Sequence, residues 1–97
     1  MSGPVAERIR RKLTVLQPTR LAIHDDSQRH AGHAGARPGG ESHFRVEIVS
    51  PAFAGESQLV RQRRVYALLA DELRVSVHAL QLSTLTPEED QIDGQPG

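Results

Sequence analysis

The chain has 97 residues, which is enough to bury one hydrophobic core but not two. It contains no cysteine, which excludes disulfides, thiol nucleophiles and cysteine-rich zinc sites, so any metal must be held by histidine or carboxylate. The formal net charge is zero, but four of the 12 acidic residues follow Pro87. Residues 1–86 are therefore mildly basic and compatible with an acidic or nucleic-acid partner.

The N-terminal segment is interpreted as part of the fold rather than as a targeting signal. Although it is rich in arginine, its apolar residues recur at helical spacing, at Val5, Ile9, Leu13 and Leu16. We predict an amphipathic helix that Pro18 ends. No apolar run approaches the roughly 20 residues needed to cross a bilayer, so we expect a cytoplasmic protein without a membrane segment.

Two strands are expected next, because apolar residues alternate with polar ones over 19–25 and again over 43–49. We expect them to be antiparallel neighbours. The segment between them is rich in glycine and small polar residues and carries His30 and His33. It is too long for a tight hairpin and too polar to be buried, so it is expected to be a mobile loop.

A long helix and a third strand complete the predicted domain. Ser57 is a plausible N-cap for a helix that reaches Leu73, and residues 77–85 alternate as a strand. Residues 87–97 hold too few apolar groups to offset their ordering entropy, so we expect an acidic, flexible tail. The prediction is an α+β domain over residues 1–86, in which two helices cover one face of a small three-stranded sheet.

The chain resembles the BolA family in four segments that occur in the family's order and spacing. They are ESHFRVEIVS from Glu41, FAGE from Phe53, RQRRVYALLADEL from Arg61, and VHALQLSTLTPEE from Val77. The resemblance also includes the first helix and the D-S-x-x-H step that begins at Asp26, so it covers nearly the whole chain except its ends. It implies an αββαβ fold of the class II KH type, which agrees with the order of elements predicted from the pattern.

The resemblance further implies partnership with a monothiol glutaredoxin and a [2Fe-2S] cluster shared between the two proteins. By the family pattern His78, in V-H-A-L, is the main ligand, and the loop supplies a second one, for which S-x-x-H selects His30 and His33 is an alternative. Two histidines can replace two thiolates on one iron, as in Rieske centres. Since this chain has no cysteine, the thiolates would come from the glutaredoxin and its glutathione.

The remaining histidines, His24 and His43, are expected to have surface or capping roles, and no compact zinc motif is present. Family members often read R-H-R where this chain has Gln62 between two arginines, so one family histidine is missing. Without the resemblance, a lone His78 would more often be a hydrogen-bonded structural residue.

Three arginines on the long helix, Arg61, Arg63 and Arg64, are candidates for a surface that binds a partner's carboxylates, glutathione or phosphates. The favoured function is a non-catalytic iron-sulfur adaptor, monomeric when alone. The alternative is a KH-like DNA-binding transcriptional regulator, although the chain has no G-x-x-G loop and few aromatic residues for stacking. An enzyme is not expected, because no nucleophile, paired base or phosphate-binding loop can be assembled.

Overall fold

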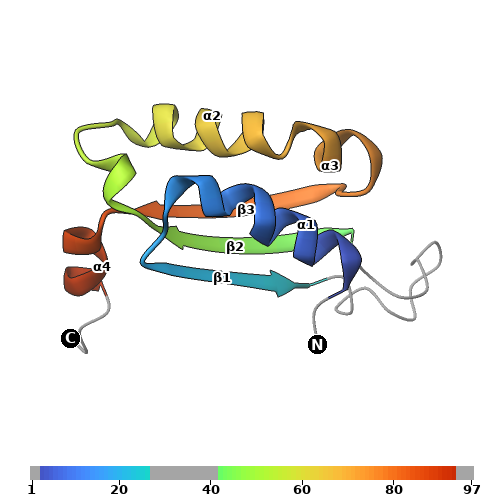
Figure 1. Ribbon diagram of the computed structural model, residues 1–97, viewed down its shortest axis with the longest axis horizontal. Helices are drawn as coiled ribbons and strands as arrows, with labels where there is room; N and C mark the ends of the chain where they lie inside the picture. The colour runs from blue at the N-terminus through green and yellow to red at the C-terminus, as the bar shows by residue number, and fades with distance from the viewer. Residues whose placement is uncertain (1–2, 27–41, 94–97) are drawn as a thin grey trace.

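The computed structural model describes residues 3–26 and 42–93, the side chains of residues 92 and 93 excepted. The strands form one sheet, and a layer of helices packs against it (Figure 1). The elements are α1 (Pro4–Leu13), η1 (Thr14–Leu16), β1 (Arg20–Asp25), β2 (His43–Val49), η3 (Pro51–Phe53), α2 (Gln58–Leu68), α3 (Ala70–Val75), β3 (Ala79–Leu85) and α4 (Pro87–Asp93). None of the helices in these ranges is long and apolar enough to cross a membrane.

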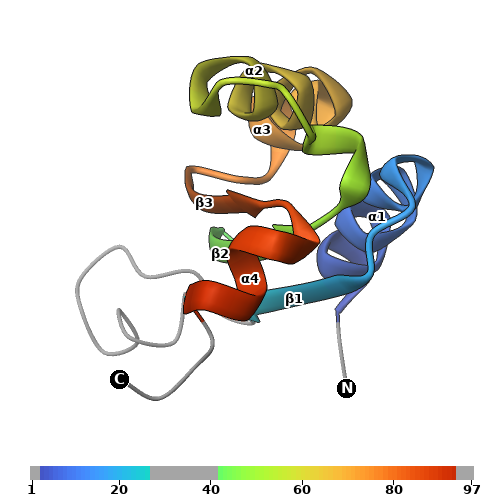
Figure 2. The same cartoon turned by 90° about the vertical axis from the view of Figure 1, so that its left-hand side faces the viewer.

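The sheet has the order β1-β2-β3, with β1 antiparallel to β2 and β2 parallel to β3. The parallel pairing follows from the connection, because a chain that returns through α2 and α3 enters β3 from the same end as β2. Figure 2 shows α1, α2 and α3 on one side of the sheet and α4 at its end. The predicted α+β class, the antiparallel first pair and the placement of the helices on one face are confirmed.

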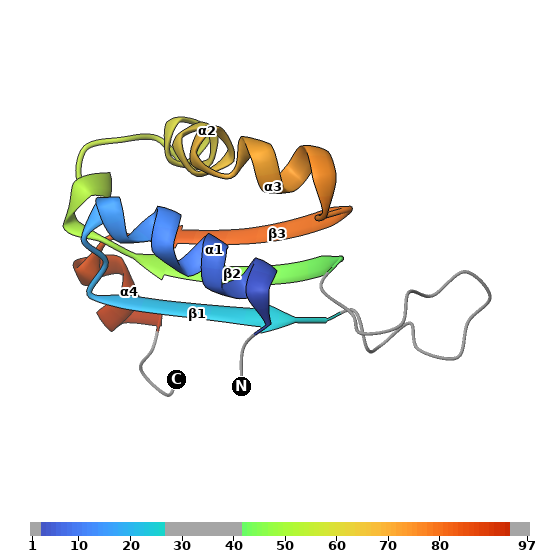
Figure 3. The ribbon, with the colours of Figure 1, turned by 45° about the vertical axis from the view of Figure 1, so that its right-hand side comes forward.

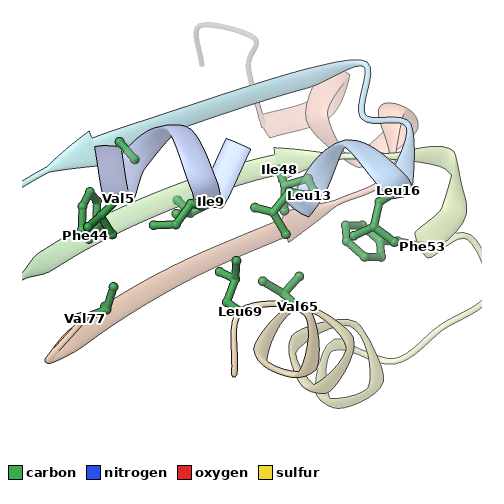
Figure 4. Close-up of a cluster of buried hydrophobic side chains, with 12 residues drawn as sticks. Val5, Ile9, Leu13, Leu16, Phe44, Ile48, Phe53, Val65, Leu69 and Val77 are labelled. Carbon is green, nitrogen blue, oxygen red and sulfur yellow. The ribbon is translucent and has the colours of Figure 1, made fainter. Parts of the chain in front are cut away.

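The core lies between the helices and the sheet (Figure 4). All four residues of the predicted stripe are buried, with Leu16 in η1 and the others in α1. α1 begins with Pro4, at a position where a backbone N–H would have no partner within the helix. Each fully buried aliphatic side chain in this layer contributes roughly 1.5–3 kcal/mol. The core residues are Val5, Ala6, Ile9, Leu13, Leu16, Phe44, Val46, Ile48, Phe53, Val65, Leu69 and Val77.

The predicted long helix is interrupted once. Ser57 caps it as expected, with its Oγ accepting from the Val60 amide at 3.2 Å. At Leu69 the backbone leaves the helical region, with φ −101° and ψ 16°, and α3 begins. Leu69 stays in the core, and α3 brings the buried Glu72 against Lys12 of α1, whose Nζ donates to Glu72 Oε1 at 2.8 Å.

The predicted flexible tail is wrong for residues 87–93, which form α4. Thr86 and Glu89 make a reciprocal capping box, in which each residue's amide donates to the other's side chain, at 2.9 and 3.2 Å. Asp90 then accepts from Arg20 of β1 at 2.7 Å. Polar capping and ion pairs therefore attach this segment to the domain. Residues 94–97 lie outside the described part.

Candidate functional site

His78 lies at one corner of the sheet, between the end of α3 and the start of β3. Its amide donates to the carbonyl of Ser42 at 2.7 Å, and the amide of Ala79 donates to the same oxygen at 3.2 Å. Ser42 is buried, whereas the His78 side chain is exposed. The backbone of His78 is thus fixed against the start of β2 while its imidazole faces outward, which is a suitable arrangement for a ligand presented to a partner.

The chain between β1 and β2 leaves and re-enters the sheet at this same end. β1 ends at Asp25, β2 begins at His43, and the Asp26 amide donates to the His43 carbonyl at 2.8 Å. Figure 3 shows the ends of these strands beside the turn from α3 into β3. The predicted loop ligands His30 and His33 lie outside the described residues, so their role stays a prediction.

The two other histidines lie beside polar groups. His43 pairs with Ala79 across the sheet, and its Nδ1 lies 2.9 Å from the hydroxyl of Ser42. His24 lies on β1 with a side chain that is 42% exposed, and its Nε2 is 3.5 Å from Glu47 Oε2. Ser42 lies directly before β2 and was not predicted as a site residue, because only its place beside the strand sets it apart in the sequence.

The side chains around His78 could supply some of the ligands of an iron-sulfur cluster, but not all of them. Within residues 3–26 and 42–93, no three histidine or carboxylate side chains are close enough together to hold a metal ion. A [2Fe-2S] cluster needs four ligands, most often thiolates. His78 can therefore act as a cluster ligand only together with groups from the remaining chain or from another protein.

Arg61 does not lie on a partner-facing surface as predicted. Its side chain is only 6% exposed, and its guanidinium lies 5.8 Å from the centre of the Phe53 ring. Nε donates to the Glu56 carbonyl at 2.9 Å, Nη1 donates to the Thr84 carbonyl at 3.1 Å, and both Nη atoms bind the Glu89 carboxylate. Arg61 is a structural residue that joins α2, β3 and α4.

The other two arginines remain at the surface of α2. Arg64 pairs with Glu56, whereas Arg63 is exposed and forms no ion pair with any residue that the structure describes. The same helix exposes Leu59 and Tyr66, at 58% and 41%. The outer face of α2 therefore combines apolar side chains with Arg63, a cation that no described carboxylate neutralises, and such a composition suits a protein interface.

Ion pairs with arginine perturb two carboxyls of α4. The bidentate bond from Arg61, helped by the Thr86 amide, lowers the pKa of Glu89 to about 2. The hydrogen bond from Arg20 lowers the pKa of Asp90 below its ordinary value. These shifts belong to the attachment of α4 and lie at the opposite end of β3 from His78. They are structural rather than part of the candidate site.

Comparison with known proteins identifies the family. A family model described as BolA-like protein matches residues 13–89. The DNA-binding transcriptional regulator BolA of Escherichia coli is 46% identical over 86 residues, which cover 88% of this chain and 78% of that protein. SufE-like protein 1 of Arabidopsis thaliana is 47% identical over 90% of this chain. The chain spans 25% of that relative and 54% of the chloroplastic BolA protein 1 of the same plant.

The structural comparison agrees with the sequence match. The solved BolA domain of SufE1 from Arabidopsis thaliana superimposes with a TM-score of 0.80 at 44% identity, covering 92% of this chain and 99% of that domain. The region matched by the family model includes all three strands and the segment with His78. The chain belongs to the BolA-like protein family.

Proposed function

We propose that this protein is a non-catalytic adaptor that binds a monothiol glutaredoxin and shares a [2Fe-2S] cluster with it, in cluster trafficking or in iron and redox regulation. The observation that carries the proposal is the His78 corner: an exposed imidazole on a backbone that Ser42 fixes at 2.7 Å. An exposed histidine of this kind has no core to stabilise, which favours a ligand role over a structural one.

The proposed ligand set divides between the two proteins. His78 and one loop histidine, His30 or His33, would bind one iron, and the glutaredoxin with its glutathione would supply the thiolates. The absence of cysteine from this chain is consistent with that division. In this proposal the isolated protein is a colourless monomer of the cytoplasm, since its own histidines make an incomplete site.

Replacement of His78 by alanine tests the proposal. Because the side chain is exposed and the bond to Ser42 comes from the backbone, we expect His78→Ala to change the free energy of unfolding by no more than about 0.5 kcal/mol. The complex with a monothiol glutaredoxin, reconstituted with iron and sulfide, should show altered absorption and visible circular dichroism, shifted toward the spectrum of the glutaredoxin alone.

The matched control is His24→Ala, which removes another exposed histidine, from β1. It should leave the spectrum of the complex unchanged. His30→Ala and His33→Ala identify the second ligand, because only the ligating one should produce a smaller version of the His78 effect. If His78→Ala lowered stability by several kcal/mol and left the spectrum unaltered, His78 would be a structural residue and the site assignment would be wrong.

A second candidate function is DNA binding, and two observations favour it. The Escherichia coli relative is named a DNA-binding transcriptional regulator, and the chain covers 78% of it. The last turn of α1 carries Arg10, Arg11 and Lys12, and α2 contains no acidic residue. Lys12 is engaged by Glu72 and Asp71, but Arg10 and Arg11 could contact phosphates, which gives affinity without sequence recognition.

A further inference from the structure

One edge of the sheet is formed by β3, and its sequence lacks the usual protection. Within the described residues β3 pairs with β2 on one side only, and its sequence over residues 75–86 contains no lysine, arginine, carboxylate or proline. Natural edge strands are commonly protected by charges, proline or bulges, because their unpaired backbone groups invite another strand. The opposite edge, β1, carries Arg20, His24 and Asp25.

The backbone of β3 presents alternate residues to β2 and to the open edge. The Ser50 amide donates to the Leu85 carbonyl, so Leu85 faces β2. The Thr84 carbonyl faces the other way and accepts from Gln58 Nε2 and Arg61 Nη1, both at 3.1 Å. By strand alternation the N–H and C=O groups of Leu80 and Leu82 also point outward.

This arrangement leaves a short accessible stretch beside the candidate site. Gln58 and Arg61 occupy the edge at Thr84, but no side chain or loop of the described residues hydrogen-bonds to the backbone of Leu80 or Leu82. The open stretch therefore runs over residues 79–83 and begins directly after His78. Figure 2 shows β3 at the margin of the sheet, under α2.

We infer that residues 79–83 are the place where an extended segment of a partner polypeptide adds to the sheet as a fourth strand. Strand addition satisfies the outward groups of Leu80 and Leu82 with backbone donors and acceptors, and an uncharged edge offers no barrier to it. A partner bound in this way would lie next to His78. The choice of partner rests on the proposed function; the docking edge itself is a separate claim.

Charge favours a different protein over a second copy of this chain. Pairing two β3 edges would bring two α2 helices together, and α2 contains no acidic residue and exposes Arg63 without an ion pair among the described residues. Like charges across such an interface cost free energy. A partner strand accompanied by a carboxylate would instead match Arg63.

Amide hydrogen exchange of the full chain, with and without a monothiol glutaredoxin, tests the inference. Within residues 79–83, only the outward amides, those of Leu80 and Leu82, should slow by about tenfold or more in the complex, because they gain a hydrogen bond. The amides of Gln81 and Ser83 face β2 and serve as internal references. Outward amides that exchange equally fast in a formed complex would overturn the strand addition and leave the proposed function standing.

A pair of lysine substitutions provides the matched test of the docking edge. Ala22, Glu47 and Ser83 lie in one row across the three strands, on the face without helices. Ser83→Lys places a charge on the β3 edge, and Ala22→Lys places the same charge beside the same Glu47 on the β1 edge. We expect Ser83→Lys to weaken glutaredoxin binding at least about tenfold and Ala22→Lys to leave it nearly unchanged.

Other outcomes are also decisive. Equal binding by the two variants would overturn the inference. Protection of the Leu80 and Leu82 amides in the free protein at high concentration would mean that a second copy occupies the edge, which overturns the assignment to a partner. If no complex with the glutaredoxin formed, both the assignment of this partner to the edge and the proposed function would be overturned.

Discussion

At the scale of single residues, Arg61 lies in a run of arginines that is expected to be solvated, yet its side chain connects several elements of the fold. Its guanidinium binds two backbone carbonyls and a carboxylate, from three different parts of the chain. Arg61→Met keeps a long side chain in the buried site but removes every donor. We expect the free energy of unfolding, measured by urea denaturation, to fall by about 2–3 kcal/mol, the size expected for unsatisfied buried polar groups.

The control for this prediction is Arg63→Met, two positions along the same helix. Arg63 is exposed and has no ion pair with a described residue, so its replacement should change stability by no more than about 0.5 kcal/mol. If the two substitutions changed the free energy of unfolding equally, the buried hydrogen bonds of Arg61 would make no net contribution to stability.

The sequence could not separate Arg61 from its neighbours. Val65 and Leu69 recur at helical spacing in the long helix, and both are in the core. Arg61 lies one helical turn before Val65 on the same stripe, but a polar residue in a charge run is normally solvated. Its burial depends on Glu89 and Thr84, more than 20 positions away, and no local pattern shows this pairing.

At the scale of elements, α4 is held to the domain by charge, which predicts acid sensitivity. The pKa of Glu89 is lowered to about 2, so its carboxylate stabilises the fold at neutral pH and loses that effect as pH falls from about 4.5 toward 2. We expect thermal unfolding of the wild type to shift to lower temperature over this range, and Glu89→Gln to be less stable at pH 7 but less sensitive to acid.

Glu88→Gln is the neighbouring control, because Glu88 is exposed and belongs to none of the ion pairs of the described residues. It should retain the acid sensitivity of the wild type. An identical pH dependence for Glu89→Gln and the wild type would contradict the structural role of the Arg61–Glu89 pair.

The helices and strands that bury apolar residues at regular spacing were predicted correctly from the sequence. The elements whose formation depends on polar groups were not. The first helix and the three strands follow from apolar spacing, although β3 begins at Ala79 rather than at residue 77 and leaves His78 just before it. The start of α4 carries a T-x-x-E capping box, which is visible in the sequence. The prediction of a flexible tail considered only the small number of apolar residues and therefore missed this helix. The break at Leu69 has no glycine or proline to mark it.

At the scale of the whole molecule, the distribution of charge predicts how the protein would bind DNA. Basic residues gather at the end of α1, where Arg10 and Arg11 are exposed, and on α2 at Arg63, all in the helical layer. We expect weak binding that is independent of base sequence and falls steeply with salt, because phosphate contacts release counterions. Fluorescence anisotropy with two unrelated duplexes over a salt series measures this.

The double substitution Arg10→Gln, Arg11→Gln should make the slope of log affinity against log salt concentration less steep by about 0.9 for each phosphate that is no longer neutralised. Arg45→Gln is the control, since Arg45 lies on the opposite face of the sheet and is engaged by Asp26 at 3.1 Å, so its replacement should leave the slope unchanged. A footprint on one particular sequence that survived raised salt would require base contacts. That result would favour transcriptional regulation over the adaptor function, because backbone electrostatics alone cannot select a site.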